Sequence, residues 1–199
     1  MSTFPDFRRF AAAFEAFDNA NAEDPNPETD ANGRVWPKEL LYAQRMSECL
    51  ARVAPGAPEA VQLAARCQHI RRWTIPRQSF PLDRPGYHRW RNSLKQYHAE
   101  LAGQLLAEVG YEPAVIGRVQ ALVQKQQLAL DPEVQLLEDV ICLVFLEYYF
   151  LDFARQHPEE KVIDIVKKTW RKMSPQGQEW ALQLALPLQA QGLVAKALA

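Results

Sequence analysis

The sequence predicts an all-α protein, a compact single-domain bundle of about seven to eight helices. No stretch of the 199 residues alternates apolar and polar side chains for long enough to form a half-buried strand. Apolar residues recur instead at steps of three and four, and prolines gather in short segments between these runs. A chain of this length can bury one sizeable core, so we expect one helical domain over residues 1–199.

The N-terminal part is expected to form a helix over residues 1–20 and a loop over residues 21–37. The helix is marked by phenylalanines that share one face, namely Phe4, Phe7, Phe10, Phe14 and Phe17. The loop, "NAEDPNPETDANGRVWP", is polar and holds three prolines and one glycine.

The core of the domain is expected over residues 37–174. A second helix begins after Pro37 and stops at "APGAP", and a third runs from about residue 58 to residue 73. Prolines 76, 81 and 85 make the next segment irregular. Two further helices are expected over about 86–110 and 112–128, with Gly110 at the end of the first.

The last helices have clear start signals. In "LDPEVQ", Asp131 is the expected N-cap, with Pro132 in the first turn of a helix that reaches about residue 155. The segment "HPEEKVIDIVKKTWRKMS" has its acids early and its bases late, as the helix dipole prefers. Residues 175–199 are expected to be helical with an interruption at Pro187.

Composition limits the classes of function. A net charge of −1 argues against general nucleic-acid binding, which needs a basic surplus. No segment is apolar enough to span a membrane, and "MSTFPDFRRF" lacks the apolar run of a signal peptide. Three widely spaced cysteines are typical of a reducing compartment, so we expect a cytoplasmic protein. The sequence does not set the oligomeric state.

Two segments of opposite charge stand out. "VQLLEDVICLVFLEYYFLDF" is apolar on nearly every face, so Glu138 and Asp139 are expected to be buried and to need partners. The stretch Arg66–Arg91 holds seven arginines and two histidines but one acid, Asp83. Arginine pairs bidentately with carboxylates and with phosphates, so these arginines could be structural partners of the buried acids or could face an anion.

His69, in "AARCQHIRRW", is either a hydrogen-bonded core histidine or part of a polar site. The sharper hypothesis joins His69, and His98, with Glu138 or Asp139. Imidazole and carboxylate would suit zinc, iron or manganese, with His69 and Asp139 as candidate ligands, although no spacing demands a metal and no cofactor is assigned.

The chain resembles the domain-of-unknown-function family 4202. The resemblance is carried by "NAEDP", "PKELLYAQRMSECL", "AARCQHIRRWTIPR", "RPGYHRWR", "DPEVQLLEDVICLVFLEYYF" and "KTWRKMS". These stretches span residues 21–174. The resemblance implies a compact, soluble, all-helical protein of undefined activity.

A second resemblance is to the HD-type metal-dependent phosphohydrolases. Tyr42 stands where their first histidine falls, and Gln68 and His69 stand in place of the His-Asp pair. "LLEDVICLV" is similar to the late helix, with Asp139 or Glu138 available. The resemblance implies a degenerate or re-purposed pocket at this place.

The predicted site therefore has a catalytic and a binding part. The catalytic candidates are His69, Glu138 and Asp139. The ligand-binding candidates are Tyr42, Arg45, Gln68, Arg72, Arg77, Arg84, Arg91 and His98.

Three functions stay open at this point. The first is an enzyme that hydrolyses a phosphorylated or nucleotide-like small molecule. The second is a non-catalytic module that binds an anionic metabolite or a partner protein. In the third, the polar residues only hold helices together, because paired charges are also common in purely structural networks.

Overall fold

The structure is a computed structural model that describes residues 7–128 and 130–199. Within these ranges it holds ten α-helices and one small two-stranded sheet, which confirms the all-α prediction. The chain divides into two compact units, Met1–Gln126 and Gln127–Ala199. The expectation of a single domain and the HD-like arrangement both remain predictions. No helix in the described ranges is long and apolar enough to cross a membrane.

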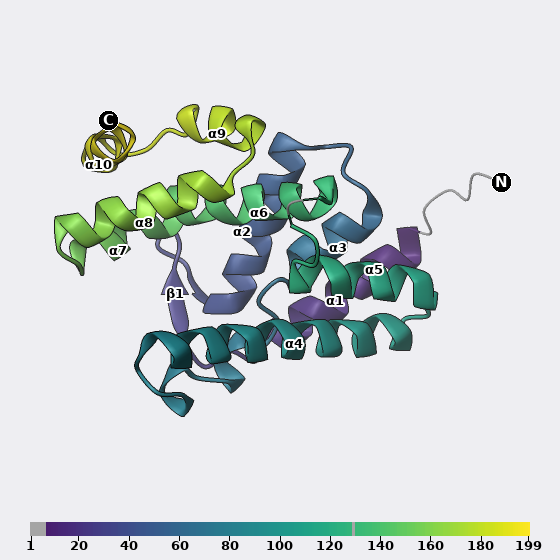
Figure 1. Ribbon diagram of the computed structural model, residues 1–199. Coiled ribbons are helices and arrows are strands. Elements are labelled where there is room, and N and C mark those ends of the chain that lie inside the picture. The colour runs from purple at the N-terminus through teal and green to yellow at the C-terminus, as the bar shows by residue number, and fades with distance from the viewer. Residues whose placement is uncertain (1–6, 129) are drawn as a thin grey trace. The chain divides into compact units, whose positions relative to one another are not determined.

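Unit 1 contains five α-helices (Figure 1). They are α1 (Phe7–Ala22), α2 (Lys38–Val53), α3 (Glu59–Cys67), α4 (Arg84–Glu108) and α5 (Pro113–Gln124). The phenylalanine stripe of α1 leads into the core at Phe17, which is fully buried, whereas Phe7 is 76% exposed at the first turn. Phe4 lies outside the described residues.

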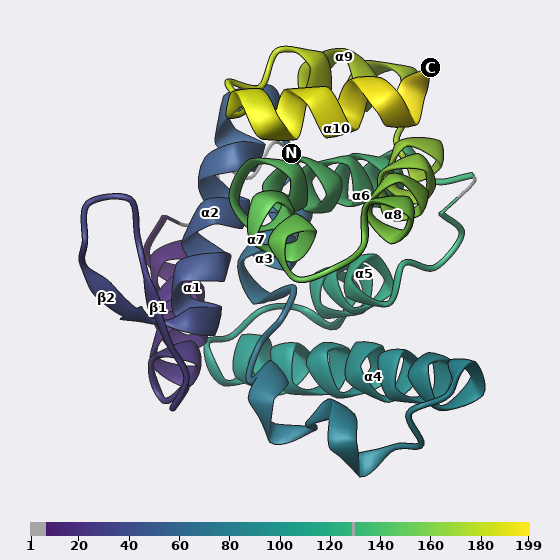
Figure 2. The same cartoon turned by 90° about the vertical axis from the view of Figure 1, so that its left-hand side faces the viewer.

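The segment expected as a loop over residues 21–37 holds a β-hairpin. Strands β1 (Pro27–Thr29) and β2 (Val35–Pro37) pair antiparallel, with Thr29 opposite Val35, and stand beside α2 (Figure 2). Asp30 closes the turn, because its carboxylate accepts hydrogen bonds from the backbone N–H of Asn32 and Arg34 and from the indole of Trp36. These bonds lower the pKa of Asp30, the one to Trp36 most. Three-residue strands are too short to show a period of two in the sequence.

Helices α4 and α5 lie side by side along much of their length (Figure 1). Gly103 leaves room for the side-chain amide of Gln120, because a Cβ there would overlap the amide nitrogen. That amide donates to the carbonyl of Ala99 at 3.1 Å, across the helix interface. A small residue on one helix and a hydrogen-bonded amide on the other thus set the approach of the pair.

Helix α3 ends at Cys67, six residues before the expected end at Trp73. Residues 68–71 form a turn, and Arg71 adopts a left-handed conformation with φ 48°. The buried Asn21 holds this turn, because its side-chain carbonyl accepts from the backbone N–H of Arg71 at 3.0 Å. A left-handed backbone conformation is sterically costly for residues other than glycine, and it persists where surrounding contacts fix the backbone. His69 therefore lies in a turn and not on a helix.

Unit 2 contains the remaining five α-helices. They are α6 (Pro132–Val144), α7 (Phe150–Arg155), α8 (Glu159–Lys172), α9 (Pro175–Leu182) and α10 (Leu188–Leu198). A π-helical turn, Phe145–Tyr149, joins α6 to α7, so the long helix expected over residues 132–155 counts as two. The C-terminal segment also splits, before Pro187. These two breaks explain why the count exceeds the seven to eight helices expected.

Asp131 caps α6 as expected, accepting from the backbone N–H of Glu133 at 3.0 Å and of Val134 at 3.4 Å. The start of α9 is held by two side chains in series. Asp139, 2% exposed, accepts from the backbone N–H and the hydroxyl of Ser174, at 2.8 Å and 2.5 Å. The same hydroxyl accepts from the backbone N–H of Gly177 at 3.0 Å. Ser174 is thus the N-cap of α9, and Asp139 orients it.

Replacing Gly177 by alanine should destabilise unit 2, because an added Cβ would lie 2.5 Å from the carboxyl carbon of Asp139. We expect a loss of about 1–3 kcal/mol in the free energy of unfolding, measured by urea denaturation. Gly192→Ala in α10 is the matched control, since nothing lies within 4 Å of its added Cβ. That control should gain about 0.5–1 kcal/mol from helix propensity. Equal losses in both variants would contradict the packing described here.

Candidate functional site

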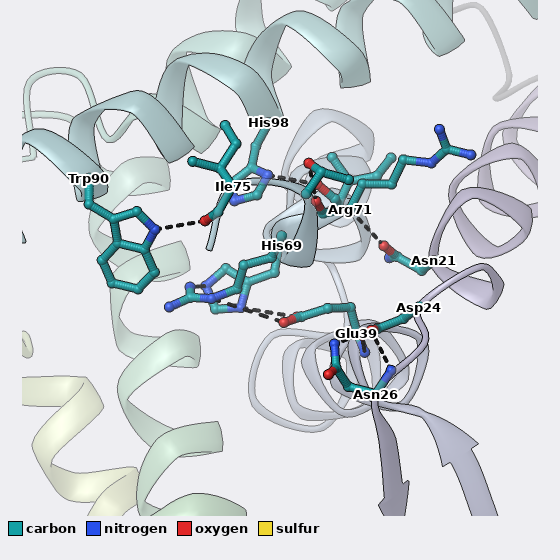
Figure 3. Close-up of polar contacts among 12 residues, drawn as sticks. Asn21, Asp24, Asn26, Glu39, His69, Arg71, Ile75, Trp90 and His98 are labelled. Carbon is teal, nitrogen blue, oxygen red and sulfur yellow. Dashed lines mark hydrogen bonds and ion pairs between the residues drawn. The ribbon is translucent and has the colours of Figure 1, made fainter. Parts of the chain in front are cut away.

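The most unusual group in unit 1 is a buried carboxylate, Glu39, in the first turn of α2. It is 7% exposed, and its Oε2 lies 3.5 Å from Nδ1 of His69 while its Oε1 lies 4.0 Å from Nε of Arg72. Asp24 fixes the backbone here, because its carboxylate accepts from the N–H of Glu39 at 3.0 Å. Figure 3 shows the Glu39 side chain pointing toward His69, with Asp24 beside its backbone. Glu39, His69 and Arg72 together are called the Glu39 cluster below.

The contacts of His69 fix its tautomer. An arginine can only donate, so the 2.9 Å contact between Nη1 of Arg72 and Nε2 of His69 makes Nε2 the acceptor. The ring proton then lies on Nδ1 and faces the Glu39 carboxylate. Tyr42 stacks on the same ring, with centroids 4.2 Å apart and planes at 15°. The imidazole is thus held by one donor, one acceptor and one aromatic face.

Arg72 has an open side as well as a buried one. Its side chain is 23% exposed, and its guanidinium lies 5.0 Å from the ring of Trp90 on α4. The Trp90 indole donates to the carbonyl of Ile75 at 2.8 Å, which fixes the ring (Figure 3). Arg91 follows on the same helix. Burial lowers the pKa of Arg72, and the positive charge of Arg91 lowers it further.

Burial sets the protonation states of the cluster. It raises the pKa of Glu39 from 4.5 to about 7, against the opposing effect of Arg72. Burial also lowers the pKa of His69 well below 6.5, with Arg72 and then His98 and Arg91 adding to the effect. At neutral pH the imidazole of His69 is therefore uncharged, and Glu39 is the group that exchanges a proton.

Two buried acceptors beside this turn have no hydrogen-bond partner among the described residues. His98 donates from Nδ1 to the carbonyl of Ile70 at 2.7 Å, which leaves its Nε2 as an acceptor without a donor. The side-chain oxygen Oε1 of Gln68 is likewise buried with no hydrogen-bond donor among the described residues. Burial lowers the pKa of His98 to about 3, so this ring is neutral too.

The family described as "Domain of unknown function (DUF4202)" matches residues 11–194. The chain belongs to this family. No curated protein and no solved structure matches it.

In this DUF4202 chain the structure brings together several of the predicted site residues. Tyr42, His69, Arg72 and His98 are linked by direct contacts around the Glu39 cluster. Arg91 acts on them electrostatically, and Gln68 lies in the turn that carries His69.

Two of the predicted arginines have other surroundings in the DUF4202 chain, and a third, Arg77, lies beside Trp90 with its guanidinium 5.9 Å from the ring that also flanks Arg72. Arg45 pairs with Glu28 of the hairpin. Arg77 donates to the carbonyls of Phe80 and Asp83 at 3.1 Å and 3.3 Å, which holds the loop before α4. Arg84 is exposed at the first residue of α4.

The predicted catalytic acids Glu138 and Asp139 belong to unit 2. Both are buried, as expected, at 3% and 2% exposure. Glu138 Oε1 lies 3.9 Å from Nζ of Lys172, and Asp139 holds the start of α9 as described above. The predicted pairing of these acids with His69 stays a prediction.

The chemistry around His69 does not fit a divalent metal. Its Nε2 faces the guanidinium of Arg72, and the nearby charge of Arg91 would repel a cation. Within residues 7–128 and 130–199, no group of three or more histidines, cysteines or acids gathers as metal ligands would. No step below is therefore assigned to a metal.

Sequence reasoning missed Glu39. An acid in the first turn of a helix is expected from the dipole alone, so "PKELLY" looked ordinary. One signal for it lies in the sequence: Glu39 is three residues from the candidate Tyr42, so the two share a helix face.

Glu39→Gln should change how stability depends on pH. Since the folded pKa lies above the ordinary value, the unfolded chain releases this proton first, and wild-type stability falls as pH rises from 4.5 toward 7. Relative to the glutamine variant, we expect wild type to lose roughly 3 kcal/mol across this range. Urea denaturation of both proteins at about pH 5 and about pH 8 measures the difference. A pH-independent difference would show that Glu39 titrates normally.

Proposed function

We propose that this chain binds a phosphorylated small molecule at Arg72 and Arg91. The observation that carries the proposal is an excess of positive charge beside two neutral imidazoles. Within residues 7–128, Glu39 is the only carboxylate that contacts Arg72 or His69. That single acid has a pKa of about 7 and so supplies at most one negative charge.

The contrast with other arginines of the same unit supports this choice. Arg66 donates to both oxygens of Asp18, at 2.7 Å and 2.6 Å, which is the bidentate geometry of a structural pair. Arg71 pairs with Glu23. Arg72 instead donates to a neutral imidazole and stands 4.0 Å from its carboxylate. Its bonding capacity is therefore not filled by residues 7–128 or 130–199.

A phosphate ester suits the groups that surround Arg72. Guanidinium forks bind phosphate oxygens with two parallel hydrogen bonds and keep their charge at any physiological pH. Trp90, whose ring is fixed by Ile75, keeps the guanidinium in place from one side. The partial burial of Arg72 strengthens its attraction for an anion, because the local dielectric is lower than in water.

Arg91→Gln should weaken binding of a phosphate monoester such as glycerol 3-phosphate by about tenfold, the effect of losing one charge-assisted contact. Isothermal titration calorimetry at low salt measures the affinity. Arg89→Gln is the matched control, because Arg89 is exposed on the same helix and the change in net charge is identical. Equal weakening in both variants would indicate only a diffuse effect of net charge. No binding by the wild-type protein would refute the proposal.

A second candidate function is hydrolysis of the bound phosphate ester, as in the HD-like interpretation but without a metal. It is favoured by one observation, the contact of Glu39 with His69. If a phosphate draws Arg72 away, Nε2 of His69 becomes free to take a proton from an attacking water, while Nδ1–H keeps its contact with Glu39. The water oxygen bonds to phosphorus, the ester P–O bond breaks, and Nε2 returns the proton to the leaving oxygen, which departs as the alcohol.

Turnover of a panel of phosphate esters and nucleotides tests the second candidate through release of inorganic phosphate. If the chain is an enzyme, His69→Gln should lower kcat by about 100-fold or more, because general acid–base catalysis is typically worth this much. The loss should exceed any change in KM. Binding without phosphate release from any ester would leave the non-catalytic module as the function.

A further inference from the structure

We propose that the site selects a dianionic phosphate monoester over a monoanionic diester, because binding places one proton on Glu39. The inference rests on the proposed function and adds the class of ligand. It follows from the geometry of a shared cation, in which the ligand and Glu39 compete for the same guanidinium.

Arg72 is the group for which the two anions compete. Its Nε faces Oε1 of Glu39 at 4.0 Å, and its Nη1 is engaged by His69 at 2.9 Å. A phosphate bound to this guanidinium brings two negative charges close to a carboxylate that is 7% exposed. An ionised Glu39 would then lose Arg72 as its counter-ion, and it would also be repelled by the nearby dianion. Taking up a proton removes both costs.

The charges that surround Glu39 make it the group that responds. Its own helix, the neighbouring hairpin and the segment before the hairpin supply two acids and two bases, whose formal charges balance: Asp24, Glu28, Lys38 and Arg45. Asp24 is committed to the backbone N–H of Glu39 and to Asn26. Glu28 is committed to Arg45.

On the other side of the cluster the charged groups are positive. Arg72 and Arg91 are near His69, and Lys125 at the end of α5 acts on it at longer range. His69 and His98 are neutral because burial lowers the pKa of both. Tyr42 and Tyr87 also act on Arg72 electrostatically.

Charge matching then gives the selectivity. With Glu39 ionised, the Glu39 cluster and Arg91 carry a net charge of about +1, which suits a monoanion. With Glu39 protonated the charge rises to about +2, which matches a phosphate monoester above its second pKa of about 6. At the same distance the attraction between charges of +2 and −2 is about four times that between +1 and −1, so the dianion binds more tightly. The proton comes from solvent. Because the pKa of Glu39 is already about 7, little free energy is needed to move the proton onto its carboxylate.

The test is calorimetry of the full chain at about pH 8 in two buffers that differ in ionisation enthalpy. Glycerol 3-phosphate is the dianionic probe and dimethyl phosphate the monoanionic one. We expect uptake of about 0.9 proton with the monoester, since one pH unit above the pKa about nine-tenths of the carboxylate is ionised. The diester should bind more weakly, with uptake near zero.

Two variants isolate Glu39. In Glu39→Gln, uptake should vanish, and the monoester should bind about tenfold more tightly than to wild type at this pH. Glu23→Gln is the control, an exposed acid of the same unit that pairs with Arg71 and does not contact Arg72. It should keep wild-type uptake. Circular dichroism of each variant checks that the fold is intact.

The outcomes separate this inference from the proposed function. Monoester binding without proton uptake, uptake that persists in Glu39→Gln, or equal affinity for the diester would overturn the inference and leave phosphate binding in place. If neither probe binds at all, the proposed function fails, and the selectivity argued from it fails too.

Discussion

The polar centre of unit 1 depends on the burial of one carboxylate. Glu39 has little water around it, so it either stays ionised through a nearby cation or holds a proton. Arg72 supplies the cation at a distance, and His69 supplies a neutral N–H. Tyr42, Trp90 and Arg91 act on the Glu39 carboxylate through their contacts and charges at His69 and Arg72.

The turn that carries His69 is as important as the residues in it. Because α3 ends at Cys67, His69 and Arg72 approach Glu39 from the segment that follows the helix. Asn21 holds this segment by accepting a hydrogen bond from the backbone N–H of Arg71, which is left-handed. A buried amide 50 residues earlier in the chain thus sets the geometry of the site. The same logic operates in unit 2, where the buried Asp139 orients the residue that begins α9.

Buried carboxylates therefore serve two different ends in this protein. Asp139 accepts hydrogen bonds at short distance from the backbone and hydroxyl of Ser174, and these bonds account for its burial. Glu39 has its own contacts at 3.5 Å and 4.0 Å, longer than good hydrogen bonds. A fully bonded acid stabilises its surroundings, whereas a loosely bonded one retains the capacity to exchange a proton or a partner. This difference is why the functional proposals rest on Glu39.

The sequence by itself determined the helical class, the family, most helix starts and the burial of Glu138 and Asp139. These follow from periodicity, capping residues and apolar runs, which are local properties of the chain. It also placed His69, Arg72 and His98 in one candidate site, because they share a basic segment and its neighbouring helix, and the resemblance to HD-type phosphohydrolases added Tyr42. Only the tertiary structure decided that Glu39 is their carboxylate partner. Burial of a first-turn acid depends on what packs over it, and the turn at Arg71 and α4 come from distant parts of the chain.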